Sequence, residues 1–111
     1  MPLSSDILKI IRQQAAKYFD SLVSLRGALH QHPEISGQES WTSALLAEKL
    51  KQLGLVVRTG MGGHGIVADL VSDPAAPTVA LRVDMDALPI QETNEAPYRS
   101  QVPGVIARLR P

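Results

Sequence analysis

Residues 82–89 of this 111-residue sequence read Arg-Val-Asp-Met-Asp-Ala-Leu-Pro and carry its most informative pattern. They begin inside residues 78–85, where apolar and other side chains alternate as in a β-strand. Two carboxylates and an arginine therefore lie where a predicted strand runs into a loop, and α/β sheets bind ligands at the carboxyl ends of strands. The alternation puts Arg82, Asp84 and Asp86 on one side, which allows a local ion pair. The competing interpretation is an ion pair that only anchors the loop.

Two helices are predicted before this stretch. Over residues 5–30, apolar side chains recur every three or four positions, a helical spacing, with an N-cap expected at residues 4–6. Pro33 marks the end, because proline cannot donate a backbone hydrogen bond and disfavours helical geometry before it. Ser-Gly-Gln-Glu at residues 36–39 has the form of a capping box and predicts a second helix, ended by Gly54.

A three-strand meander is expected next. Residues 55–59 and 65–72 are rich in β-branched side chains and flank the glycine-rich residues 60–64, which predicts a hairpin. Residues 78–85 supply the third strand. After Asp86, prolines and polar residues predict a long loop without regular elements. The expected fold class is α/β, with two N-terminal helices followed by a three-strand meander.

The glycines at positions 60, 62 and 65 match G-x-G-x-x-G, with Asp84 nineteen positions after the last glycine. A dinucleotide site of this kind needs a helix that opens at the glycines and points its N–H groups at the pyrophosphate. Residues 66–71 are strand-like instead. We therefore interpret the motif as a glycine-rich hairpin.

Composition excludes several classes of protein. Eleven Lys and Arg balance eleven Asp and Glu, and 44% of the residues are apolar, which argues against disorder and against nucleic acid as a partner. There is no cysteine, so no disulfide or Cys-ligated zinc is possible. No apolar run approaches the roughly 20 residues that span a bilayer. Asp6, Lys9 and Arg12 interrupt the N-terminal apolar residues, which argues against a secretory signal and makes the cytoplasm the expected location.

His30 and His32 lie two positions apart at a helix end, a poor geometry for converging on one metal ion. A structural role is the better interpretation, because histidine in a last turn can donate to free carbonyls. Glu34 lies close enough in sequence to hold either ring. His64, in the glycine turn, is expected to be a solvent-exposed loop residue.

Taken together, these motifs resemble the N-terminal part of the metal-dependent amidohydrolases. That family includes hippurate hydrolase, aminoacylases, N-acetyldiaminopimelate deacetylase and indoleacetyl-amino-acid hydrolases. The resemblance runs from about residue 6 to residue 105, and Gly63 to Ala68 is part of it. Its further residues are His30, His32, Pro33, Glu34, Arg82, Asp84, Asp86, Pro89, Glu92, Tyr98, Ser100 and Gly104.

The resemblance implies that residues 1–105 are an incomplete part of a zinc-peptidase-like catalytic domain. The intact enzyme would hydrolyse N-acyl amino acids such as hippurate with water activated on a divalent metal, zinc, manganese or similar. Homo-oligomeric assembly is compatible with the resemblance. In related two-zinc peptidases the strand ends in H-x-D, whose histidine binds metal, but Arg82 cannot be a ligand. The amidohydrolase branch has this same substitution, so Asp84 is implied to orient a ligand or the Arg82 guanidinium without touching metal.

The sequence departs from the family after Gly104-Val105, where M-H-A-C-G-H-D would bring two metal ligands. Residues 106–111 read Ile-Ala-Arg-Leu-Arg-Pro, a tail foreign to the family. Inserting one C into ATG CAC GCC TGC GGC CAC gives ATC GCA CGC CTG CGG CCA, which encodes these six residues and suggests a frameshift. We expect this chain to bind no metal and to be an inactive, truncated amidohydrolase. The alternative is a small non-enzymatic binding or regulatory domain.

Overall fold

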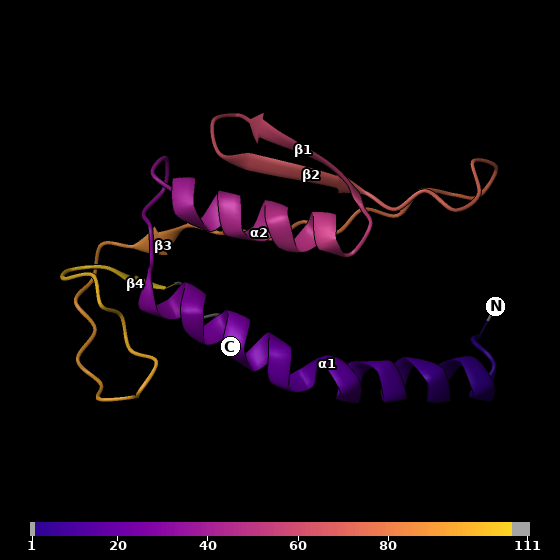
Figure 1. The fold of residues 1–111 in the computed structure, drawn as a ribbon, viewed down its shortest axis with the longest axis horizontal. Coiled ribbons are helices and arrows are strands. Elements are labelled where there is room, and N and C mark those ends of the chain that lie inside the picture. The colour runs from indigo at the N-terminus through magenta and orange to yellow at the C-terminus, as the bar shows by residue number, and fades with distance from the viewer. Residues whose placement is uncertain (1, 108–111) are drawn as a thin grey trace.

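The computed structural model describes residues 2–107. Figure 1 shows two helices that run past one another, with a hairpin above the second helix and a short strand pair near the end of the first. The elements are α1 (Ser5–Gln31), α2 (Ser40–Gln52), β1 (Val56–Met61), β2 (Gly65–Asp69), β3 (Ala87–Leu88) and β4 (Ile106–Ala107). Residues 108–111, which carry most of the foreign tail, lie outside the described residues.

Helix α1 follows the prediction closely. Ser4 is its N-cap, and the hydroxyl oxygen of Ser4 accepts a hydrogen bond from the Ile7 N–H at 3.3 Å. The N-terminal half of α1 extends past the other elements (Figure 1), and Ile7, Ile11 and Tyr18 on it are exposed. The helical periodicity therefore predicts the helix correctly, although no described element covers much of its apolar face.

The start of α2 differs from the expected capping box. The side chain of the N-cap residue Glu39 makes no capping hydrogen bond to the helix. Its carboxylate accepts from the Gly37 N–H at 2.9 Å, and the first-turn N–H groups of Trp41 and Thr42 donate to Glu34. The capping-box prediction is wrong, because a carboxylate from the preceding segment reaches the positive end of the helix first.

The end of α2 is as predicted. Gly54 has a φ of +82°, the left-handed geometry that glycine tolerates best. Its N–H donates to Lys51 and the Leu55 N–H donates to Leu50, the paired bonds of a Schellman motif.

Strands β1 and β2 form the predicted antiparallel hairpin, with Val56 opposite Asp69 and Met61 opposite Gly65. A β-carbon at Gly65 would collide with the carbonyl oxygen of Met61, so the tight turn requires glycine here. A strand rather than a helix follows Gly65, as the hairpin interpretation of the glycine motif requires.

The predicted third strand is not confirmed among residues 2–107. Residues 77–86 are extended but form no strand, and over residues 2–107 no strand pairs with them. The predicted α/β class and the hairpin are confirmed, and the three-strand meander is not. The long loop after Asp86 also contains short regular structure, because Ala87 pairs with Ala107 and Leu88 with Ile106. A strand needs a neighbour to accept its hydrogen bonds, and alternation within one segment cannot show whether that neighbour is present.

Few apolar side chains are fully enclosed among the described residues, where Ala47 and Ala87 are the buried hydrophobic positions.

None of the helices within residues 2–107 has the length and apolar character needed to cross a membrane.

Candidate functional site

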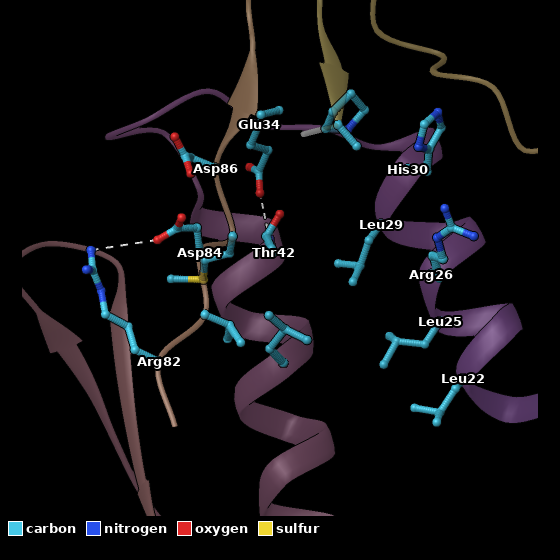
Figure 2. Close-up of a pocket in the computed structure, with 16 residues that line it drawn as sticks. Leu22, Leu25, Arg26, Leu29, His30, Glu34, Thr42, Arg82, Asp84 and Asp86 are labelled. Atoms are coloured by element: carbon cyan, nitrogen blue, oxygen red, sulfur yellow. Dashed lines mark hydrogen bonds and ion pairs between the residues drawn. The ribbon is translucent and has the colours of Figure 1, made fainter. Parts of the chain in front are cut away.

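Residues 82–87 line a cleft of about 510 Å³ between the C-terminal half of α1 and the start of α2. Figure 2 shows Leu22, Leu25 and Leu29 of α1 on one side of this cleft. Residues 82–87, which we call the acidic segment, lie on the other side. Residues 82–86 also line a second, more polar cleft of about 700 Å³ with the hairpin turn and residues 36–39. Residues 82–86 of the sequence motif are therefore accessible from two clefts.

Arg82 and Asp84 form the local ion pair that the alternation allows, with Arg82 Nη2 3.8 Å from Asp84 Oδ1. The Arg82 side chain is 93% exposed and that of Asp84 is 30% exposed. An exposed pair at this distance is worth about 0–1 kcal/mol, too little to fix the loop by itself. Asp86 lies two residues further along, on the walls of both clefts.

Glu34 joins three parts of the structure. Its carboxylate accepts from the N–H groups of Trp41 at 3.1 Å and Thr42 at 2.6 Å, which caps α2 (Figure 2 shows the contact with Thr42). Its backbone carbonyl accepts from the Ala87 N–H at 2.8 Å, and Ile35 forms an isolated parallel bridge with Ala87. The loop after α1 thereby connects the start of α2 to the end of the acidic segment.

Burial alone would raise the pKa of Glu34. Hydrogen bonds from the side chain and N–H of Thr42 and from the N–H of Trp41, with a smaller contribution from the charge of His64, outweigh it and hold that pKa below its usual range. Glu34 therefore stays ionised near neutral pH, as a helix cap requires.

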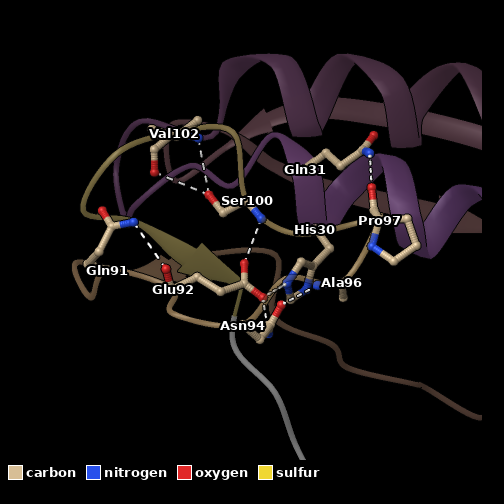
Figure 3. A network of polar contacts seen from close by, with 9 residues as sticks. All are labelled: His30, Gln31, Gln91, Glu92, Asn94, Ala96, Pro97, Ser100 and Val102. Carbon is tan, nitrogen blue, oxygen red and sulfur yellow. Dashed lines mark hydrogen bonds and ion pairs between the residues drawn. The ribbon is translucent and has the colours of Figure 1, made fainter.

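His30 makes its main contact with Glu92, which lies 62 residues later in the chain. His30 Nε2 is 2.8 Å from Glu92 Oε1, and the two side chains are 5% and 2% exposed (Figure 3). Glu92 also accepts from Asn94 Nδ2 and from the Ser100 N–H, each at 2.6 Å. The Ser100 N–H and the His30 ring are the main causes that hold the pKa of Glu92 below its usual range.

Further contacts attach the loop after β3 to the end of α1. Gln31 Nε2 donates to the Pro97 carbonyl at 3.1 Å, and the Gln101 N–H donates to the Gln31 carbonyl at 2.9 Å. The Tyr98 ring meets the His30 ring edge-on with centroids 5.5 Å apart. Sequence reasoning placed Glu92 and Tyr98 in the family pattern but assigned them no contact with α1.

The remaining motif residues have local partners. His32 Nδ1 lies 3.0 Å from the Ala28 carbonyl, and its ring packs against Trp41 with centroids 4.9 Å apart. Pro33 is buried. Pro89 follows β3 at a tight bend, where the Ile90 N–H donates to the Leu88 carbonyl.

His64 is partly buried in the hairpin turn and lines the polar cleft.

Glu34 binds neither His30 nor His32. Its carboxylate accepts hydrogen bonds from α2, and the partner of His30 is Glu92.

The described residues do not fit a metal centre. Within residues 2–107, no three His, Asp or Glu side chains lie close enough together to hold a metal ion. One ring nitrogen of His30 contacts Glu92 and one of His32 contacts a backbone carbonyl. A metal site would therefore need ligands from outside this part of the chain.

Comparison with known proteins identifies relatives of this chain. No protein-family profile matches the chain. It is 43% identical over 102 residues to the putative amidohydrolase YhaA of Bacillus subtilis, a match that covers 92% of this chain and 26% of the relative. It is 38% identical over 82 residues to the hippurate hydrolase of Campylobacter jejuni, covering 74% of this chain and 21% of that enzyme.

A solved structure shares the fold. The crystal structure of the Bacillus subtilis YXEP protein, described as a dinuclear metal binding peptidase from the M20 family, matches 83% of this chain and 26% of its own. The TM-score is 0.76 and the sequence identity is 31%. The architecture of the chain is thus similar to part of an M20 peptidase.

The chain is therefore similar, over most of its length, to members of the amidohydrolase and M20 peptidase family, as its sequence motifs suggested. It spans about a quarter of the length of the curated relatives it matches.

Proposed function

We propose that residues 1–105 form part of the catalytic domain of an amidohydrolase that cleaves the amide bond of N-acyl amino acids such as hippurate. The observation that carries the proposal is the stretch of residues 82–86, which lines two clefts in a chain 43% identical to the putative amidohydrolase YhaA. Relatives named hippurate hydrolase and N-acetyl-L-cysteine deacetylase support the substrate class. We also propose a cytoplasmic location.

In this proposal Asp84 orients a metal ligand or the Arg82 guanidinium and does not bind metal itself. The contacts of Glu34 with α2 and Ala87 support such a role, because they hold the end of the acidic segment beside the start of α2. A divalent metal, zinc, manganese or similar, would be held by residues outside the described part of the chain.

We further propose that the 111-residue chain by itself hydrolyses no N-acyl amino acid, and that residues 106–111 result from a frameshift. The alternative, a small independent binding or regulatory domain, predicts polar, well-solvated edges. Val79, Leu81 and Val83 are instead highly exposed apolar side chains, which favours a part that other structure covers.

The experiment that tests this function is a chimera. In the Campylobacter jejuni hippurate hydrolase, the matched 82-residue stretch is replaced by the corresponding residues of this chain, and hippurate cleavage is measured with and without a metal chelator. We expect cleavage that the chelator abolishes. A folded chimera that retains its metal but does not cleave hippurate, while the parent enzyme does, would contradict the proposal.

A further inference from the structure

The Glu92 carboxylate joins the end of α1 to the chain that leads into β4 (Figure 3). Glu92 Oε1 lies 2.8 Å from His30 Nε2, and Glu92 Oε2 accepts from the Ser100 N–H at 2.6 Å. The Glu92 side chain is 2% exposed. A carboxylate this deeply buried needs its donors, because the loss of a partner leaves the charge poorly compensated. Glu92 therefore fixes the loop around Ser100 relative to α1.

Hydrogen bonds continue from Ser100 to the start of β4. The Ser100 hydroxyl accepts from the Val102 N–H and donates to the Val102 carbonyl, each at 3.2 Å. The Val102 carbonyl also accepts from the N–H of Val105, the residue directly before β4, at 3.2 Å. The Gly104 N–H donates to Gln91 Oε1 at 2.6 Å. Through these bonds, two neighbouring side chains of the loop hold the approach to β4 at two points.

β4 brings the chain to the 510 Å³ cleft. It pairs with β3, where Ala107 lies opposite Ala87, the residue directly after Asp86. Ala107 lines the cleft together with Asp86, and so does His30, the partner of the buried carboxylate. The network around that carboxylate therefore sets two parts of the cleft wall.

We propose that Glu92 is a positioning residue of the proposed amidohydrolase site, because it holds β4 and His30 where they form the cleft wall. The proposal rests on the proposed function, since the position of the wall affects turnover only if substrate reacts in this cleft. Gln91 has the same role through its contact with Gly104. A misplacement of about 1 Å in an active site can cost about 100-fold in rate, so a small shift of β4 is enough to matter.

The first part of the test is amide hydrogen exchange in the 111-residue chain, which needs no activity. Residues 105–107 should exchange slowly, and Glu92→Gln should speed their exchange about 10-fold more than that of β1 and β2. Gln91→Ala should act in the same direction, and Gln91→Glu, which keeps an acceptor oxygen, should restore slow exchange. Glu95→Gln, at an exposed position in the same loop, is the matched control and should change neither region.

The second part measures turnover in a chimera that contains the whole loop. Residues 1–105 of this chain replace the corresponding part of the Campylobacter jejuni hippurate hydrolase, and hippurate cleavage is measured per folded molecule. Glu92→Gln should lower kcat about 10-fold and leave KM within about twofold, because the wall is displaced but substrate still enters the cleft. Gln91→Ala repeats the measurement with the buried carboxylate intact, so the test is decided even if Glu92→Gln fails to fold. Glu95→Gln should change neither constant.

Exchange that speeds by the same factor in all elements would overturn the proposal, because it would show a loss of global stability only. So would residues 105–107 that exchange fast before any substitution, or an unchanged kcat in an active chimera. A chimera with no hippurate turnover at all, together with exchange that speeds only at residues 105–107, supports the positioning of β4 by Glu92 and speaks only against the proposed function.

Discussion

His30 Nε2 at the end of α1 and Glu92 Oε1 in the loop after β3 are joined by a hydrogen bond of 2.8 Å, and both side chains are almost completely buried. Glu92 accepts two further hydrogen bonds, from Asn94 and Ser100. Because an ionised carboxylate can only accept, His30 Nε2 carries the proton in this contact. The loop is thereby attached to α1 through one carboxylate that has three donors.

Replacing Glu92 with glutamine should destabilise the 111-residue chain. Glutamine keeps the size of the side chain but loses the charge, and it replaces one of the two acceptor oxygens with an NH₂ group, which cannot accept a hydrogen bond. We expect Glu92→Gln to lower the melting temperature by about 5 °C or more. Glu95→Gln, at an exposed position in the same loop, is the control and should change it little. Equal effects of the two substitutions would show that the pair does not hold the loop.

The same carboxylate predicts how stability depends on pH. The pKa of Glu92 is below its ordinary value of 4.5 in the folded chain, so the unfolded chain binds its proton more readily. The stabilisation is therefore complete above about pH 4.5 and is lost as the pH falls through the lowered pKa. Melting curves from pH 7 to pH 3 should show wild type and Glu92→Gln converging at the acidic end. A difference that stays constant down to pH 3 would contradict this assignment.

Glu34→Gln should weaken the start of α2. The substitution removes the negative charge that faces the Trp41 and Thr42 N–H groups, and the loss of a helix cap costs about 1 kcal/mol. The free energy of unfolding in urea measures this loss. Glu48→Gln, at an exposed position later in α2, is the matched control. A loss for Glu48→Gln as large as that for Glu34→Gln would mean that the capping contact contributes nothing.

Asp84→Asn tests the proposed orienting role in the hippurate hydrolase chimera. It keeps the volume and removes the charge, and losing such a partner costs about 10- to 100-fold in activity or metal affinity. Hippurate turnover per folded molecule and bound zinc are measured together. Asp69→Asn, in the exposed ion pair with Arg58, should change neither. If Asp84→Asn lowers only the melting temperature, Asp84 is a loop anchor.

The departure at residues 106–111 predicts a result at the level of DNA. Removing one base near codon 106 should restore Met-His-Ala-Cys-Gly-His-Asp in frame after Gly104-Val105. Sequencing both strands of the locus tests this directly. Codons that cannot yield this run in any frame would refute the frameshift.

The elements that depend on neighbours in sequence were predictable. Periodicity gave α1, Gly54 gave the end of α2, and the glycine turn gave the β1–β2 hairpin, because each depends on contacts within a few residues. The pairing of β3 with β4 was not predictable, since its strands are 18 residues apart and two residues long.

The polar contacts of the candidate site show the same division. The local contact of Arg82 with Asp84 followed from alternation, whereas the contact of His30 with Glu92 spans 62 residues and has no local signal. The capping box failed because Glu34, which lies outside the four-residue pattern, competes for the same N–H groups. A rule based on a four-residue pattern cannot account for a competing carboxylate that becomes close only in the folded chain.

The double attachment of Glu34 has a mechanical consequence. Its carboxylate holds the first turn of α2 and its carbonyl holds Ala87, the residue directly after Asp86. A shift of α2 is therefore transmitted to the acidic segment through one residue, and the two cannot be displaced independently while these bonds last. Insertions or substitutions in residues 32–39 would then change the positions of Asp84 and Asp86 through the bond between Glu34 and Ala87, so the connection between the helices helps to set the site geometry.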